Sequence, residues 1–159
     1  MDAYHPRVSR TAYLLGYAGL LPQIAAVVLV ALFPRSPDTL HYWLLGLGIA
    51  LVYGTLILSF LGGVWWGFAM RRSKGQPQLG GIAVLPSLAA LPLVIWTMSY
   101  GLQASAWPLV LLGVLIIATL TIDRHLAATR DAPPDWMRLR APLSLGLGGL
   151  TILAGLLAA

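Results

Sequence analysis

Five long apolar stretches, separated by short connections that carry nearly all of the charge, constrain this chain more than any motif does. A helix needs about 20 apolar residues to cross a hydrocarbon core roughly 30 Å thick, and each stretch is close to that length. The stretches cover residues 12–33, 41–70, 81–101, 105–122 and 141–159. We therefore expect an all-α membrane protein, a five-helix transmembrane bundle that forms one integral domain over residues 1–159.

The composition agrees with this expectation, because 58% of the residues are hydrophobic, only 9% are charged and the mean hydropathy is +0.82. These values exclude a soluble globular domain. The chain has no cysteine, which excludes disulfides, thiolate metal sites and thiol nucleophiles. Its net charge of +5 comes from clusters beside the apolar stretches, not from one basic face, so we expect no nucleic-acid binding.

Positive charge predicts how the helices are oriented, since cytoplasmic connections retain Lys and Arg. Of the ten Lys and Arg residues, all except Arg35 fall on one side of the predicted bundle. These are Arg7, Arg10, Arg71, Arg72, Lys74, Arg124, Arg130, Arg138 and Arg140. The prediction is N-terminus in and C-terminus out. No small-x-small cleavage site follows the first stretch, so we expect a retained helix and not a signal peptide.

The second stretch is the longest, about 45 Å as a straight helix, and it carries small residues at every fourth position. These residues are Thr55, Ser59, Gly63 and Gly67. Such a pattern lets two helices pack closely in lipid, so we expect a second helix against this face. A helical wheel places Trp66 on the same side, filling space between helices, and Trp65 opposite, at the lipid interface.

A second small face lies opposite the first, in the other half of the same stretch. Its residues are Gly46, Ala50 and Gly54. With small residues on both sides, this helix is predicted to be the central helix of the bundle.

The core of the second stretch also carries a family resemblance. The segment Ser59–Gly67 reads Ser-Phe-Leu-Gly-Gly-x-x-Trp-Gly, and it resembles the uncharacterised bacterial inner-membrane family that includes the mitochondrial transmembrane protein 69. The resemblance implies a five-helix membrane domain and implies no activity. It agrees with a multi-pass protein of the bacterial inner (cytoplasmic) membrane, whose first partner is the lipid bilayer.

The densest polar cluster is Asp123, Arg124 and His125, at the charged end of the fourth stretch. One interpretation makes Asp123 a proton or cation acceptor beside a histidine that titrates near neutral pH. The interpretation we favour is an interfacial ion pair of Asp123, either with Arg124 or with an arginine of the connection after the second stretch. The histidines lack metal-ligand spacing, so we expect no metal site.

A candidate ligand pocket is assembled from large or polar side chains of the predicted helices. Its residues are Tyr53, Trp66, Met70, Trp96 and Gln23. Gln23 is the only amide deep in a span, where it contacts a ligand or, as we favour, hydrogen-bonds a neighbouring helix. Pro86 and Pro92 are expected to bend the third helix.

Two functions remain open, and neither is catalytic. The chain has no phosphate-binding loop, no His-Glu-x-x-His and no Gly-x-Ser-x-Gly elbow, so we expect no enzyme and no cofactor. The first function is a structural, accessory or assembly subunit of a membrane complex, with a membrane-protein partner or as a homo-oligomer. The alternative is a binder or carrier of a lipid, quinone or tetrapyrrole, by analogy with the tryptophan-rich sensory proteins, which bind porphyrin and cholesterol.

Overall fold

Helices make up most of the part of the chain that the computed structural model describes, residues 8–101 and 106–159. The helices are α1 (Arg10–Ala18), α2 (Leu21–Leu32), α3 (Leu40–Met70), α4 (Gln76–Tyr100), α5 (Trp107–Ala128) and α6 (Trp136–Leu157). Since α1 and α2 follow one another along the single span Arg10–Leu32, these residues contain five spans long and apolar enough to cross a membrane. The prediction of an all-α chain with five spans is confirmed.

The first span is broken at Gly19 and Leu20, between α1 and α2. Pro22 has no backbone N–H, so it cannot donate to the carbonyl of Ala18 and the helix cannot continue unchanged. The hydroxyl of Tyr53 on α3 donates to the carbonyl of Gly19. This bond satisfies a carbonyl group at the break, as the membrane interior requires.

Three helices extend beyond their apolar stretches at the end of the bundle where α1 begins. α4 starts at Gln76, α5 continues to Ala128 and α6 starts at Trp136. A hydropathy pattern marks where a chain is apolar and does not mark where its helical hydrogen bonding stops. The extension places Asp123 and Arg140 inside helices, whereas the sequence pattern put them in a connection.

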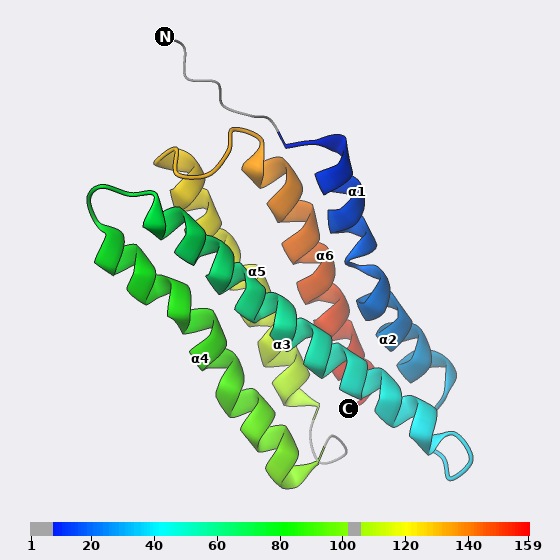
Figure 1. Cartoon of the computed structure of the whole chain (residues 1–159). Helices are drawn as coiled ribbons and strands as arrows, with labels where there is room; N and C mark the ends of the chain where they lie inside the picture. The colour runs from blue at the N-terminus through cyan, green and yellow to red at the C-terminus, as the bar shows by residue number, and fades with distance from the viewer. Residues whose placement is uncertain (1–7, 102–105) are drawn as a thin grey trace.

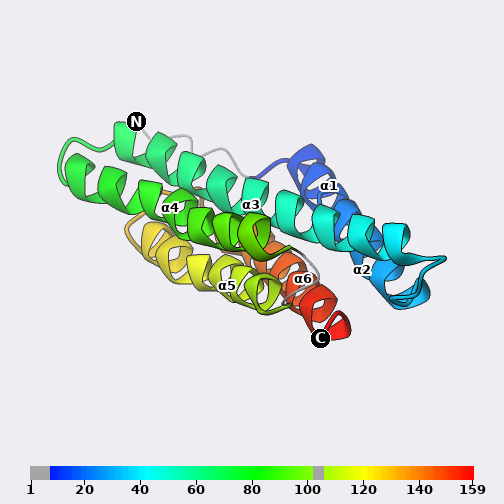
Figure 2. The same ribbon diagram turned by 90° about the horizontal axis from the view of Figure 1, so that it is seen from below.

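The spans lie side by side, and α3 crosses obliquely in front of α5 and α6 (Figure 1). Seen from below, α3 and α4 lie on one side of α5 and α6, and α1 and α2 lie at the right of the view, beside α3 and α6 (Figure 2). α3 contacts α2, α4, α5 and α6. The prediction that the second span is the central helix is therefore confirmed.

Glycines let the helices approach closely at three crossings, as expected where lipid supplies little hydrophobic drive for association. A Cβ atom added to Gly113 of α5 would lie 2.5 Å from the carbonyl oxygen of Gly148 on α6. A Cβ at Gly46 of α3 would lie 2.9 Å from the carbonyl oxygen of Ala26 on α2. At the crossing of α3 and α4, a Cβ on Gly62 would overlap the carbonyl oxygen of Ala83.

The expected packing face of Thr55, Ser59, Gly63 and Gly67 is not covered by a helix of this chain at its glycines. Among the described residues, none has an atom within 4 Å of a Cβ added to Gly63 or Gly67, and both glycines are exposed. Thr55 and Ser59 are half-buried. The prediction is wrong because α4 meets α3 at Gly62, and neighbouring residues differ by about 100° around a helix.

The expected roles of the two tryptophans are also reversed. Trp65 is only 3% exposed, whereas Trp66 is 49% exposed and faces the surface of the bundle. The indole N–H of Trp65 donates to Asp123 of α5 at 2.9 Å. A buried indole needs such a partner, and the carboxylate lies on the side of α3 that also buries Leu58.

Candidate functional site

A charged pair is buried between α5 and α6. Asp123 is 0% exposed and Arg140 is 7% exposed. The guanidinium Nε of Arg140 donates to Oδ2 of Asp123 at 3.0 Å, and Nη2 lies 3.0 Å from the same oxygen. Ionised residues inside membrane spans are costly, and they persist there when they pair with one another.

Two indoles complete the coordination of this carboxylate. Nε1 of Trp65 donates to Oδ1 of Asp123 at 2.9 Å, and Nε1 of Trp136 donates to the same oxygen at 3.2 Å. The guanidinium carbon of Arg140 also lies 5.8 Å from the centroid of the Trp136 ring, within the range of a cation–π interaction. These four residues, which we call the Asp123 cluster, join α3, α5 and α6.

Only Asp123 of the predicted polar cluster belongs to this network. Arg124 and His125 are exposed, because three consecutive residues of a helix cannot face the same side. The ion-pair partner of Asp123 is Arg140, so the expected pairing with Arg124 or with a connection arginine is wrong. The spacing of Trp136 and Arg140, four residues apart on one helix face, is the sequence signal that would have indicated their shared role.

A second ion pair joins two connections outside the spans. Nε of Arg72, which follows α3, donates to Oδ1 of Asp131 at 2.9 Å, and Thr129 donates to the other carboxylate oxygen. The hydrogen bond from Arg72 is the main cause that holds the pKa of Asp131 below its ordinary value, against the opposing effect of burial. The pair fixes the α3–α4 connection to the α5–α6 connection.

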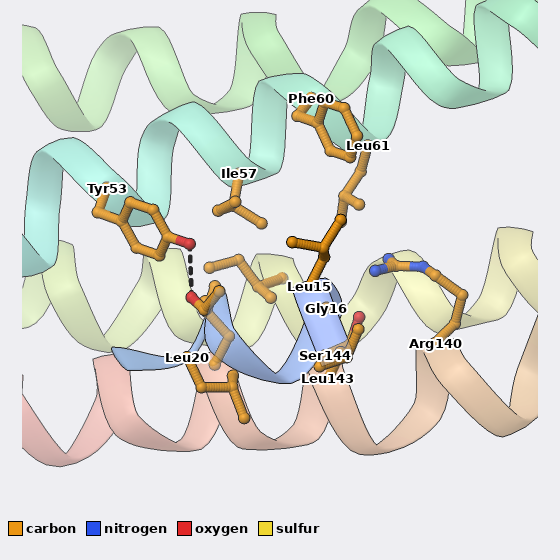
Figure 3. Close-up of a pocket in the computed structure, with 13 residues that line it drawn as sticks. Leu15, Gly16, Leu20, Tyr53, Ile57, Phe60, Leu61, Arg140, Leu143 and Ser144 are labelled. Atoms are coloured by element: carbon orange, nitrogen blue, oxygen red, sulfur yellow. Dashed lines mark hydrogen bonds between the residues drawn. The ribbon is translucent and has the colours of Figure 1, made fainter. Parts of the chain in front are cut away.

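A cavity of about 340 Å³ lies beside the Asp123 cluster, between α1, α3 and α6. Apolar side chains form most of its wall, among them Ile57 of α3 and Leu143 of α6 (Figure 3). Leu15 of α1 and Phe60 of α3 also line it, and these side chains are 69% and 63% exposed. The cavity therefore opens between α1 and α3, toward the surroundings of the bundle.

Three polar side chains interrupt this apolar wall, namely those of Tyr53, Arg140 and Ser144. The hydroxyl of Tyr53 is occupied by Gly19 at the break of the first span. Oγ of Ser144 is buried and makes no hydrogen bond with any residue that the structure describes. Nη2 of Arg140 is also buried and makes none, although it is ion-paired with Asp123. Figure 3 shows the guanidinium directed from α6 toward Leu15 and Leu61. Buried polar atoms that make no hydrogen bond are rare and costly, and here they mark one end of the cavity with unused donors.

Of the predicted pocket residues, only Tyr53 lines this cavity. Gln23 is fully buried in α2, and its Nε2 donates to Oγ1 of Thr151 on α6 at 2.8 Å. Gln23 thus makes the hydrogen bond to a neighbouring helix that we favoured from the sequence.

The other predicted pocket residues lie elsewhere on the bundle. Trp66 and Met70 border a shallow groove with the first turns of α4. Trp96 lies toward the other end of α4, where its ring centroid is 5.4 Å from that of Trp107. The structure does not bring the five residues into one pocket, since wheel positions alone do not say which helices are neighbours.

Within residues 8–101 and 106–159, no three His, Asp or Glu side chains come together in a way that would hold a metal ion.

Comparison with known proteins places this architecture in a family. The family described as "Protein of unknown function (DUF3429)" matches residues 8–157, nearly the whole chain. The chain belongs to the DUF3429 family. No curated protein and no solved structure matches it. The Asp123 cluster and the cavity lie entirely within the segment that defines the family, and the resemblance to an uncharacterised family is confirmed at this level.

Proposed function

We propose that the protein is a non-catalytic membrane protein that binds a hydrophobic ligand in the cavity between α1, α3 and α6. The observation that carries the proposal is a buried serine hydroxyl, Oγ of Ser144, that makes no hydrogen bond with any described residue in a mostly apolar wall. Beside it, Nη2 of Arg140 is ion-paired with Asp123 but also makes no hydrogen bond, so it too has N–H groups to donate. A volume of about 340 Å³ falls within the range of small-molecule sites. A few polar groups in an apolar pocket are the arrangement that orients a ligand.

α1 supplies a route by which such a ligand enters from the bilayer. This helix has nine residues, none of them buried, and it ends at the break before α2. A helix this short gains little stability by itself, and α1 loses little packing when it moves. Outward movement of α1 would widen the opening between Leu15 and Phe60, while α2 remains held to α6 by Gln23.

Native mass spectrometry of the protein, extracted in mild detergent, tests the proposal. We expect a retained small hydrophobic molecule in the wild type, and its loss in Ile57→Trp, because the larger side chain occupies the cavity. The matched control is Ile95→Trp, since Ile95 is 53% exposed on α4, away from the cavity. A wild-type protein that is empty in several lipid mixtures, or equal retention by both variants, would refute ligand binding.

The subunit of a membrane complex remains a second candidate, favoured by the uncovered glycines of α3. Gly63 and Gly67 lie on a face of α3 that none of the described helices covers. A transmembrane helix of a different membrane protein is the partner that this candidate requires. We expect Gly63→Leu to abolish co-purification of such a partner without lowering stability, and unchanged co-purification would count against this role.

The membrane and the orientation of the chain are part of the same proposal. We place it in a bacterial inner membrane with the N-terminus in and the C-terminus out, because positive residues collect at the end of the bundle where α1 begins. The motif at Ser59–Gly67 supports a relationship to the mitochondrial transmembrane protein 69.

A further inference from the structure

We infer that the head group of the ligand is a neutral hydrogen-bond acceptor, a carbonyl oxygen such as that of a quinone or a carboxylic ester, and not an anion. The inference rests on the proposed ligand cavity and specifies what its polar end recognises. Two features of that end carry it: the two groups that make no hydrogen bond there are donors, and the charge of Arg140 is already balanced by Asp123.

The two groups that make no hydrogen bond are donors. A guanidinium has five N–H donors and no acceptor, and a serine hydroxyl donates one hydrogen bond. Ser144 follows Arg140 by four residues on α6, so both side chains lie on the same face of that helix. Both residues line the cavity, and in the described part of the chain neither Oγ nor Nη2 makes a hydrogen bond, although Nη2 lies 3.0 Å from its ion-pair partner Asp123. A ligand oxygen that accepts hydrogen bonds supplies what these donors lack.

The charge at this end is already balanced. Asp123 neutralises Arg140 by direct contact, and the carboxylate also accepts from both indoles of the cluster. Among the described residues, no charged side chain other than Arg140 lines the cavity. An anionic head group would therefore leave one uncompensated negative charge in an apolar site, and the desolvation of such a charge is far more costly than that of a carbonyl.

Two sources of neutral carbonyl oxygen are abundant chemical classes in membranes, quinones and acyl esters. Both combine a carbonyl with an apolar remainder that suits the aliphatic wall and its opening toward lipid. The shared chemistry is what the geometry specifies, and the binding experiment separates the two sources.

The experiment uses the full chain, delipidated in detergent, with three probes. These are decylubiquinone, methyl oleate and oleate, the last titrated at a pH where it is ionised. Binding is followed by the rise in thermal midpoint with probe concentration and by native mass spectrometry. We expect a neutral carbonyl probe to bind, and oleate to bind at least about tenfold more weakly than methyl oleate, because it brings an uncompensated charge. The tighter of decylubiquinone and methyl oleate identifies the source.

Ser144→Ala tests the contact itself, because it removes one donor and leaves the Asp123 cluster unchanged. Loss of one hydrogen bond should lower the affinity for the neutral probe by about five- to tenfold. The control is Ser59→Ala, a half-buried serine of α3 that does not line the cavity, and its affinity should equal that of the wild type.

The outcomes separate failure of the head-group inference from failure of the proposed ligand cavity. Oleate that binds as tightly as methyl oleate, or a Ser144→Ala protein with wild-type affinity, would overturn the inference while the cavity remains a ligand site. A wild-type protein that binds none of the three probes, yet retains a native ligand, would also overturn it. Failure of the ligand-retention experiment with Ile57→Trp would instead remove the proposed function.

Discussion

Asp123 is the residue on which the charged end of the bundle depends. It is fully buried in α5, where a carboxylate is tolerated only if its oxygens are hydrogen-bonded and its charge is paired. Oδ1 accepts hydrogen bonds from the indole N–H groups of Trp65 and Trp136, and Oδ2 accepts one from the guanidinium of Arg140. Loss of the negative charge would leave a buried guanidinium uncompensated.

We therefore expect Asp123→Asn to lower the free energy of unfolding by about 3 kcal/mol, a cost typical of breaking a buried pair. The asparagine oxygen still accepts from an indole but cannot neutralise Arg140. Thermal unfolding in detergent measures the effect. The matched control is Asp135→Asn, because its partner Arg138 has an 82% exposed side chain, and this pair should contribute less than about 1 kcal/mol. Equal losses in the two variants would contradict the buried pair.

Asp131 provides a pH-dependent contribution outside the spans. Its hydrogen bond from Arg72 lowers the pKa of the carboxyl in the folded protein, so this pair stabilises the fold above the unfolded pKa of about 3.9. The contribution disappears as the pH falls through the lowered pKa of the folded state. We expect the wild type to have a higher thermal midpoint than Asp131→Asn at neutral pH, with the difference vanishing in acid. A difference that persists in strong acid would show that Asp131 acts through something other than its charge.

At the scale of the elements, a rotation of one residue decides which face of α3 is buried. Small residues occur on more than one side of this helix, so the sequence pattern allows several packing faces. The actual contact with α4 runs through Gly62, next to Gly63 in sequence but about 100° away around the helix. The position of α4, which is set by packing, decides which of these faces of α3 is buried.

A pair of alanine substitutions separates these adjacent glycines. We expect Gly62→Ala to destabilise the protein by about 1–3 kcal/mol, because the new Cβ overlaps the carbonyl oxygen of Ala83 on α4. Gly63→Ala meets no described atom within 4 Å, so its better helix propensity should leave stability unchanged or raise it by up to about 1 kcal/mol. Unfolding in detergent reports both. A larger loss for Gly63→Ala would restore the packing face first predicted from the sequence.

The elements also show what the sequence predicts and what it cannot. Span number and helical class follow from hydropathy, because lipid imposes a length and an internally bonded backbone. The pairing of Asp123 with Arg140 depends on how α5 and α6 are aligned across their connection, and no local pattern contains that alignment. Without knowledge of that alignment, the sequence places Asp123 at the end of a span. It then gives no reason to expect that Trp65 is buried and Trp66 exposed.

At the scale of the whole molecule, the positive charge gathers at one end of the bundle, and three segments far apart in the sequence line the cavity. α1, α3 and α6 come from the beginning, the middle and the end of the chain, so their shared cavity has no sequence signature (Figure 3). The charge asymmetry does have one, because every described Lys and Arg except Arg35 lies toward the end of the bundle where α1 begins. The side of the membrane on which this positively charged end lies is a separate question, which labelling answers.

The orientation test uses the absence of cysteine, which allows single cysteines to be labelled without background. Ser36 lies between α2 and α3 and Ser73 between α3 and α4, at opposite ends of the bundle. In right-side-out vesicles we expect an impermeant thiol reagent to label Ser36→Cys and to spare Ser73→Cys until the membrane is permeabilised. The physical reason is that Arg71, Arg72 and Lys74 around Ser73 resist translocation, whereas Arg35 beside Ser36 is offset by Asp38. Labelling of Ser73→Cys alone in intact vesicles would invert the assignment and would place the Asp123 cluster at the outer side of the membrane.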